Sequence, residues 1–166
     1  MKLRKYVDRS LEIFLVLIMS LLVVDVVWQV ASRYLFSNPS SFTDELAGFL
    51  LVWVGMAGAA YVKGKNEHLA IDILHGKLTP ATRIKLLLFI NLLVTAFCLS
   101  IMVAGGSWLV YTRFVMHQIS AAMHIPIGYV YLIVPVSGLI MSYYSLDDIK
   151  NLYREWKTSD HASHGT

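Results

Sequence analysis

The sequence has 166 residues, of which 57% are hydrophobic, and its mean hydropathy is +0.60. Soluble domains hold about 45–50% apolar residues, and the apolar residues here form runs long enough to cross a bilayer. The composition therefore excludes an ordinary soluble domain. The net charge of +3 is divided among short basic patches between these runs. Such patches suit lipid headgroups and disfavour a nucleic-acid-binding face.

Four apolar runs, taken in chain order, predict four transmembrane helices. The first, residues 11–33, is too long for the apolar region of a signal peptide and lacks a cleavage site after it, so we expect it to be retained. The others cover residues 46–62, 86–111 and 125–144. None alternates apolar and polar residues as a barrel strand would. The sequence therefore predicts an all-α integral membrane protein with a single membrane domain, residues 1–166.

The distribution of basic residues predicts the orientation. Twelve of the 14 Lys and Arg residues lie in the tails, residues 1–10 and 145–166, or in the loop between the second and third spans. The exceptions are Arg33 and Arg113, which lie in the other two loops. Because Lys and Arg accumulate in cytoplasmic loops, we expect both termini in the cytoplasm. An even number of spans independently requires the two ends on one side.

The first span carries two polar residues on one helix face, Asp25 and Gln29. A carboxylate near the bilayer centre costs about 2.5–3.5 kcal/mol on insertion scales, so Asp25 should face protein or water, or be protonated. No second carboxylate lies deep in any other span. We therefore favour a polar contact to another helix over an ion or proton pathway.

The segment SNPSSFTDE, Ser37–Glu45, leads into the second span. Thr43 can cap a helix that begins near Asp44, and the acids Asp44 and Glu45 suit the positive N-terminal end of that helix. Phe42 can dip into the membrane interface, which is compatible with a short interfacial helix before the span. A second hypothesis makes Phe42, Asp44 and Glu45 a docking surface, since paired carboxylates bind a partner's arginines.

The second span is short and rich in small residues. Gly55 and Ala59 lie one turn apart, a spacing that lets two membrane helices approach closely. We expect these two residues to pack against another helix.

Side chains that could carry chemistry are few. The only cysteine, Cys98, lies in an apolar run and excludes an internal disulfide. No phosphate-binding loop, zinc-protease helix or nucleophile–base pair is visible. The histidines near the spans lie in loops or at span ends, which disfavours a haem held by two histidines: His68, His75, His117 and His124. We predict a protein that is no enzyme and holds no cofactor or metal of its own.

Three segments then form an ordered pattern. QVASRYLF, Gln29–Phe36, ends the first span, and IPIGYVYLIVP, Ile125–Pro135, begins the fourth. Between them, Thr43–Leu74 places an acidic pair before an LxVW helix, followed by small residues and a loop with His and Asp. Its motif residues are Asp44, Glu45, Trp53, Gly58, Ala59, Ala60, His68 and Asp72. In order and spacing, these segments resemble the DctQ-type small membrane subunit of tripartite ATP-independent periplasmic (TRAP) transporters. Asp44 departs from the Glu of many relatives but keeps the charge.

This resemblance implies a scaffold subunit in a bacterial inner membrane rather than a complete transporter. Its partners would be a large permease subunit, a periplasmic substrate-binding protein and membrane lipid, but no nucleic acid. Sodium would bind to the large subunit, and the substrate taken up by symport would be an organic acid, with sialic acid the first candidate. The loop that contains Arg113 and His117 becomes a second candidate docking surface for the periplasmic protein.

The same sequence features are also compatible with two other functions. One is a stand-alone four-helix carrier that uses Asp25 as its proton site. The other is a membrane redox subunit. The absence of a convergent site favours the scaffold over both.

Overall fold

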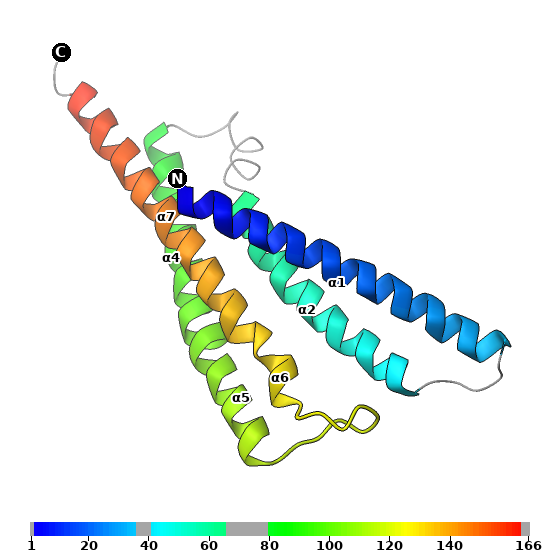
Figure 1. The fold of residues 1–166 in the computed structure, drawn as a ribbon. Coiled ribbons are helices and arrows are strands. Elements are labelled where there is room, and N and C mark those ends of the chain that lie inside the picture. The colour runs from blue at the N-terminus through cyan, green and yellow to red at the C-terminus, as the bar shows by residue number, and fades with distance from the viewer. Residues whose placement is uncertain (1, 36–40, 66–79, 164–166) are drawn as a thin grey trace.

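The computed structural model describes residues 2–35, 41–65 and 80–163. These residues are almost entirely helical, and the strand pairing within them is one isolated bridge between Ile119 and Pro126. In chain order (Figure 1), the helices are α1 (Lys2–Leu35), α2 (Ser41–Lys65), α4 (Pro80–Phe97), the π-helix η1 (Cys98–Gly105), α5 (Gly106–Val115), α6 (Gly128–Tyr131) and α7 (Ile133–Ser163).

Four helical stretches are long and apolar enough to cross a membrane. They are Arg4–Tyr34, Ser41–Lys65, Thr82–Val115 and Gly128–Arg154. The expected all-α fold with four spans is therefore confirmed. The helices are mostly longer than the apolar runs because helix formation does not stop at the edge of the hydrocarbon. The 34 residues of α1 cover about 51 Å, which exceeds the roughly 30 Å of a bilayer core.

The start of the second span differs from the expectation. We expected a helix that begins near Asp44 with Thr43 as its cap, or a short interfacial helix before it. Instead α2 runs without interruption from Ser41 to Lys65, so Thr43 and Asp44 lie in its first turn. The reason is that the residues from 41 to 46 include no Gly or Pro to end a turn. A separate interfacial helix is not formed in the described range.

The fourth span is interrupted where the sequence places a proline. The chain leaves α6 after Tyr131 and enters α7 at Ile133. Pro135 has no N–H to donate to the carbonyl of Tyr131, and a proline ring also crowds that carbonyl. The break at Leu132 follows from this missing hydrogen bond.

The third span is one continuous helix that widens into η1 where it meets α7. Glycine allows close approach at this contact, because a Cβ on Gly138 of α7 would lie 2.7 Å from the Cβ of Met102. On the other side, a Cβ on Gly106 would lie 3.1 Å from the Cδ of Pro135. Helix α7 therefore packs closely against η1 and the start of α5.

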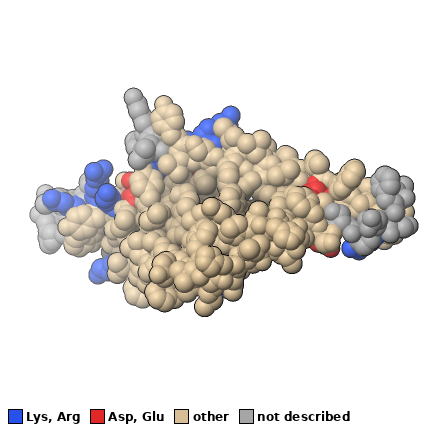
Figure 2. All heavy atoms as spheres, turned by 60° about the horizontal axis from the view of Figure 1, so that its bottom comes forward, with Lys and Arg blue, Asp and Glu red and all other residues tan. Residues whose placement is uncertain are grey.

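The helices form an open layer rather than a closed bundle. Helix α1 packs along α2, α2 along α7, and α7 along α4 and η1. In its most apolar window only 11% of the first span is buried, against 39% of the fourth, because α1 is at an edge and α7 is central. Much of the face in Figure 2 is accordingly uncharged, with charged side chains towards its margins.

The two ends of this layer differ in which chain segments meet there. At the termini end, α1 begins, α2 ends and the polar half of α7 lies close by (Figure 1). At the loop end, α1 ends, α2 begins and a connection joins α5 to α6. The second hairpin consists of the third span (α4, η1 and α5) and the fourth (α6 and α7). It lies closest to the α1–α2 hairpin at the termini end, and the two diverge towards the loop end (Figure 1).

Candidate functional site

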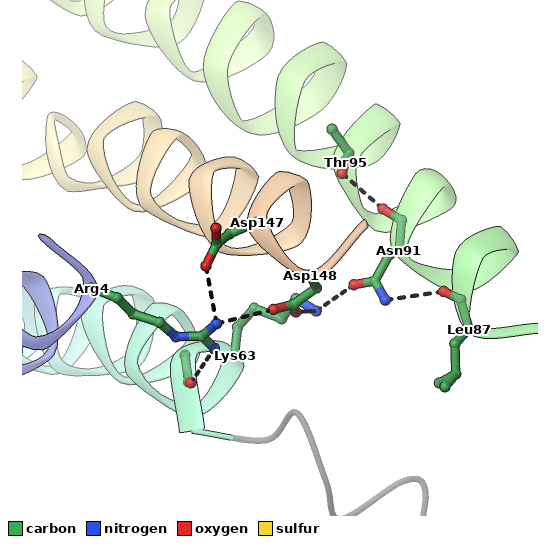
Figure 3. A network of polar contacts seen from close by, with 8 residues as sticks. Arg4, Lys63, Leu87, Asn91, Thr95, Asp147 and Asp148 are labelled. Atoms are coloured by element: carbon green, nitrogen blue, oxygen red, sulfur yellow. Dashed lines mark hydrogen bonds and ion pairs between the residues drawn. The ribbon is translucent and has the colours of Figure 1, made fainter. Parts of the chain in front are cut away.

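At the termini end, side chains from four helices meet in a polar network (Figure 3). Arg4 of α1 forms ion pairs with Asp147 and Asp148 of α7, at Nη1–oxygen distances of 3.4 and 3.3 Å. Asp148 is only 6% exposed, and its second oxygen accepts a hydrogen bond from Lys63 Nζ of α2 at 3.1 Å. One buried carboxylate therefore binds two cations from two different helices. We call this group, with Asn91, the termini-end network.

Lys63 extends the network to the third span. Its Nζ also donates to Asn91 Oδ1 of α4 at 2.7 Å. Asn91 is 6% exposed, and its Nδ2 donates to the carbonyl of Leu87 at 3.0 Å. The hydroxyl of Thr95 donates to the carbonyl of Asn91 at 2.8 Å. These bonds offset the cost of burying the amide, so that Lys63 ties α2, α4 and α7 together.

Tyr144 of α7 completes the contact between the hairpins at this end. Its side chain is fully buried, and its hydroxyl donates to Asp8 Oδ1 of α1 at 2.5 Å. Gly64 of α2 lies against the ring, where a Cβ would be 2.8 Å from Cζ of Tyr144. The carbonyl of Gly64 accepts a hydrogen bond from Arg4 Nη2 at 2.8 Å. The end of α2 therefore needs a residue without a side chain.

At the loop end, Glu45 of α2 binds the turn between α5 and α6. Its Oε1 accepts a hydrogen bond from the N–H of Ala121 at 3.1 Å. Its Oε2 accepts from the N–H groups of Ala122 and Met123 at 2.8 and 3.0 Å. The hydroxyl of Ser120 also hydrogen-bonds Glu45. Successive backbone N–H groups of this kind form an anion-binding concavity, which Glu45 fills.

Asp44 makes a different contact from its neighbour. Its Oδ1 accepts a hydrogen bond from Gln29 Nε2 of α1. The two acids of the predicted docking surface therefore hold different parts of the chain, Asp44 the end of α1 and Glu45 the second hairpin. Phe42, the third member, is 49% exposed. The docking role of these three residues stays a prediction.

Asp25 lies on the face of α1 that also carries Gln29. It is 6% exposed, and its buried Oδ2 has no hydrogen-bond partner in the described part of the chain. Gln29 is half-buried. The structure thus places both residues at the contact with α2. The orphaned oxygen makes Asp25 the polar group least well accommodated in this contact.

Gly55 and Ala59 lie on a face of α2 that the rest of the described chain leaves open. Both are exposed, and no atom lies within 4 Å of a Cβ built on Gly55. On a neighbouring face, Trp53 Nε1 donates to the carbonyl of Val130 in α6 at 3.0 Å, which ties α2 to the second hairpin. Since no helix within residues 2–35, 41–65 and 80–163 packs on this face, the packing role of Gly55 and Ala59 stays a prediction.

The loop candidates Arg113 and His117 differ in access. Arg113 donates to the side-chain oxygen of Gln118 and lies over the ring of Tyr131, with its guanidinium carbon 5.6 Å from the ring centroid. His117 is exposed and has a positive φ of 48°. Arg113 therefore helps to hold the connection between α5 and α6, whereas His117 is accessible for contact.

Comparison with known families decides what kind of protein this open layer belongs to. Residues 4–155 match the family described as tripartite ATP-independent periplasmic transporters, DctQ component. The chain belongs to this family. The resemblance that the sequence motifs indicated is thus confirmed, and this DctQ-family chain is a TRAP small permease subunit rather than an enzyme.

Relatives of the DctQ-family chain carry matching names. It is 26% identical over 140 residues to a putative TRAP transporter small permease protein of Haemophilus influenzae. The aligned residues cover 84% of this chain and 85% of the relative. It is 27% identical over 152 residues to the sialic acid TRAP transporter small permease protein SiaQ of Vibrio cholerae, over 92% of this chain and 86% of SiaQ.

A third relative is much longer. The sialic acid TRAP transporter permease protein SiaT of Haemophilus influenzae is 38% identical over 66 residues, which cover 40% of this chain but 11% of SiaT. The matched segment is therefore a small part of a longer permease chain.

Ligand-binding residues do not gather in the described part of the DctQ-family chain. Across residues 2–35, 41–65 and 80–163, no group of three or more His, Cys, Asp or Glu could hold a metal ion. Three motif or haem candidates lie outside these ranges: His68, Asp72 and His75. The described polar groups instead join helices to one another.

Reasoning from the sequence missed the termini-end network. In the sequence, Arg4 and Lys63 are two of the twelve positive charges that predict the orientation, and no pattern pairs them with an acid. The signal that could have found the network is the acid pair Asp147 and Asp148, directly after the fourth apolar run. Acids on the same side of the membrane as two basic clusters indicate ion pairs between span ends.

Proposed function

We propose that this chain is the scaffold subunit that supports a large permease subunit in sodium-coupled uptake of an organic acid. The observation that carries the proposal is the open layer, in which polar side chains bind other helices and the apolar faces stay uncovered. A carrier needs a site where polar groups converge on a substrate. A scaffold needs stable helices and free apolar area, which this layer offers.

The partner that we infer is a permease of several hundred residues. The match within SiaT supports it, because a segment like this one there forms part of a much longer permease chain. In the present protein the corresponding partner would be a separate subunit. It would carry the substrate and the sodium ions.

We also propose that the termini end is cytoplasmic and the loop end periplasmic. The excess of Lys and Arg in the tails and the middle loop supports this orientation. The turn bound by Glu45 would then face the periplasm, together with the exposed side chains of Phe42, Met116 and His117. This surface would meet the periplasmic protein that delivers the substrate.

Sialic acid is the substrate that we put first. The names of SiaQ and SiaT support it, although identity to SiaQ is only 27%. Other carboxylate-bearing solutes are the alternative substrate class. Inhibition of labelled sialic acid uptake by unlabelled solutes of each class distinguishes the two.

The test uses proteoliposomes that contain this chain and the large permease subunit proposed as its partner. With the periplasmic binding protein outside and an inward sodium gradient, labelled sialic acid should accumulate. Omission of this chain, of the binding protein or of the gradient should each abolish uptake. Uptake by the isolated chain would instead show that it is a stand-alone carrier and would contradict the scaffold role. Failure of the two membrane subunits to co-purify would also count against it.

A further inference from the structure

The two hairpins are joined differently at the two ends of the layer. At the termini end, the network holds them through several ion pairs and hydrogen bonds. Towards the loop end the hairpins diverge (Figure 1). Two side-chain hydrogen bonds of α2 reach the second hairpin there, from Trp53 to the carbonyl of Val130 and from the turn to Glu45. Glu45 lies two helical turns beyond Trp53, so it makes the outermost of these joints.

The turn itself has backbone bonds that shape it but leave three N–H groups for Glu45. Its own bonds run from Ser120 N–H to the Ile125 carbonyl at 2.9 Å and from His124 N–H to the Ser120 carbonyl at 3.2 Å. The N–H groups of Ala121 and Ala122 both donate to the carboxylate of Glu45. Without this carboxylate, the turn loses a charged acceptor from consecutive donors.

Ser120 supports the carboxylate from the turn. It is 2% exposed, and its hydroxyl contacts Glu45 while its oxygen accepts from the N–H of Met123 at 3.2 Å. Glu45 reaches this buried hydroxyl from the second turn of α2. The contact therefore joins a carboxylate of α2 to a buried side chain and three backbone N–H groups of the turn.

We propose that Glu45 is a latch that orders the turn at residues 120–123 and couples it to α2. The latch makes the loop end one surface, on which Met116, His117 and Ile119 are exposed around the ordered turn. Glu45 is a positioning residue, because it acts through the turn and touches no substrate. Its use in docking a soluble protein partner rests on the proposed function, whereas the latch itself does not.

Amide hydrogen exchange on the purified full chain tests the latch directly. In Glu45→Ala, peptides that cover residues 119–124 should exchange roughly tenfold faster or more, because the N–H groups of Ala121 and Ala122 lose their acceptor and that of Met123 loses one of two. Glu45→Asp should behave like Glu45→Ala, since its carboxylate is one methylene too short. Glu45→Gln should be intermediate, because a neutral oxygen accepts more weakly.

The control is Asp44→Asn, which changes the adjacent acid but leaves the turn's acceptor in place. Its turn should exchange like the wild type. Should Glu45→Ala fail to fold, Ser120→Ala is used in its place, because it alters the same contact on the side of the turn. Amide exchange in the turn should then still be several-fold faster than in the wild type. If the turn of Glu45→Ala, or of Ser120→Ala where it is used instead, exchanges at the wild-type rate, the proposed latch is wrong.

A second readout separates positioning from simple stability. In proteoliposomes with the permease, Glu45→Ala should raise the binding-protein concentration for half-maximal uptake roughly tenfold and leave the maximal rate unchanged. Glu12→Gln, which alters a surface ion pair at the other end, should change neither. A lower maximal rate with an unchanged half-maximal concentration would contradict the positioning role. If the wild-type complex transports nothing, the proposed function fails while the exchange data still decide the latch.

Discussion

Asp148 is the residue on which the termini-end network depends. Its two oxygens bind Arg4 and Lys63 from different helices, whereas Asp147 makes one contact at 3.4 Å and is 36% exposed. Loss of this carboxylate removes the acceptor that Arg4 and Lys63 share, and breaking a buried ion pair typically costs about 3–5 kcal/mol. Exposed ion pairs contribute about 1 kcal/mol or less.

Asp148→Ala should therefore lower the free energy of unfolding by about 3 kcal/mol, and the matched variant Asp147→Ala by less than about 1 kcal/mol. Unfolding of the purified chain in mixed micelles, followed by circular dichroism, measures both. Equal losses would show that the network does not centre on Asp148.

Asp25 differs from Asp148, because its buried Oδ2 has no hydrogen-bond partner in the described part of the chain. Asp25→Asn keeps the shape of the side chain and removes any charge. We expect stability within about 1 kcal/mol of the wild type and normal uptake by the reconstituted transporter. Abolished uptake with intact assembly would instead support Asp25 as a proton site and revive the carrier hypothesis.

At the scale of elements, glycine sets how closely the hairpins approach. Gly64 of α2 faces the ring of Tyr144, which cannot yield easily because its hydroxyl is bonded to Asp8. Gly58, in the same helix, has no atom within 4 Å of its Cβ position. The same substitution should therefore have opposite effects at these two positions.

Gly64→Ala should destabilise the chain by about 2 kcal/mol, because the ring or the end of α2 must move. Gly58→Ala should be neutral or stabilising by up to about 1 kcal/mol, since alanine favours helix over glycine. Thermal unfolding of both variants gives the comparison. A stabilised Gly64→Ala would mean that α2 and α7 are not in this close contact.

At the scale of the whole molecule, the open layer leaves apolar faces that lipid or a protein must cover. The face of α2 with Gly55 and Ala59 is exposed and lined by small residues, which suits close approach by another helix. Nothing in the described chain occupies it. Its occupant is therefore a question about the assembled transporter.

Gly55→Leu should leave the stability of the isolated chain unchanged but lower its co-purification with the large permease roughly tenfold, because the larger side chain separates the two helices. Val16→Leu, at an exposed position of α1, serves as the control for added bulk. Wild-type yield of the Gly55→Leu complex would indicate that this face meets lipid.

The sequence predicted the four spans because the length of an apolar run decides whether a helix crosses a bilayer. It predicted less about contacts, since nearly every face of a membrane helix is apolar and hydrophobicity does not mark the packed one. Asp25 and Gln29 are exceptions, because polar side chains avoid lipid. The start of α2 was placed too late, because the helix extends through polar residues that the apolar pattern ignores.

What the sequence by itself determined is therefore local: helices from long apolar runs, an even number of spans, and the family from ordered motifs. The tertiary structure alone decided which helices are neighbours and which charges pair. Arg4 and Asp148 are 144 positions apart, and Glu45 and Ala122 are 77 apart. Such pairs depend on how whole helices pack in space, and no pattern within a few turns of one helix contains that information.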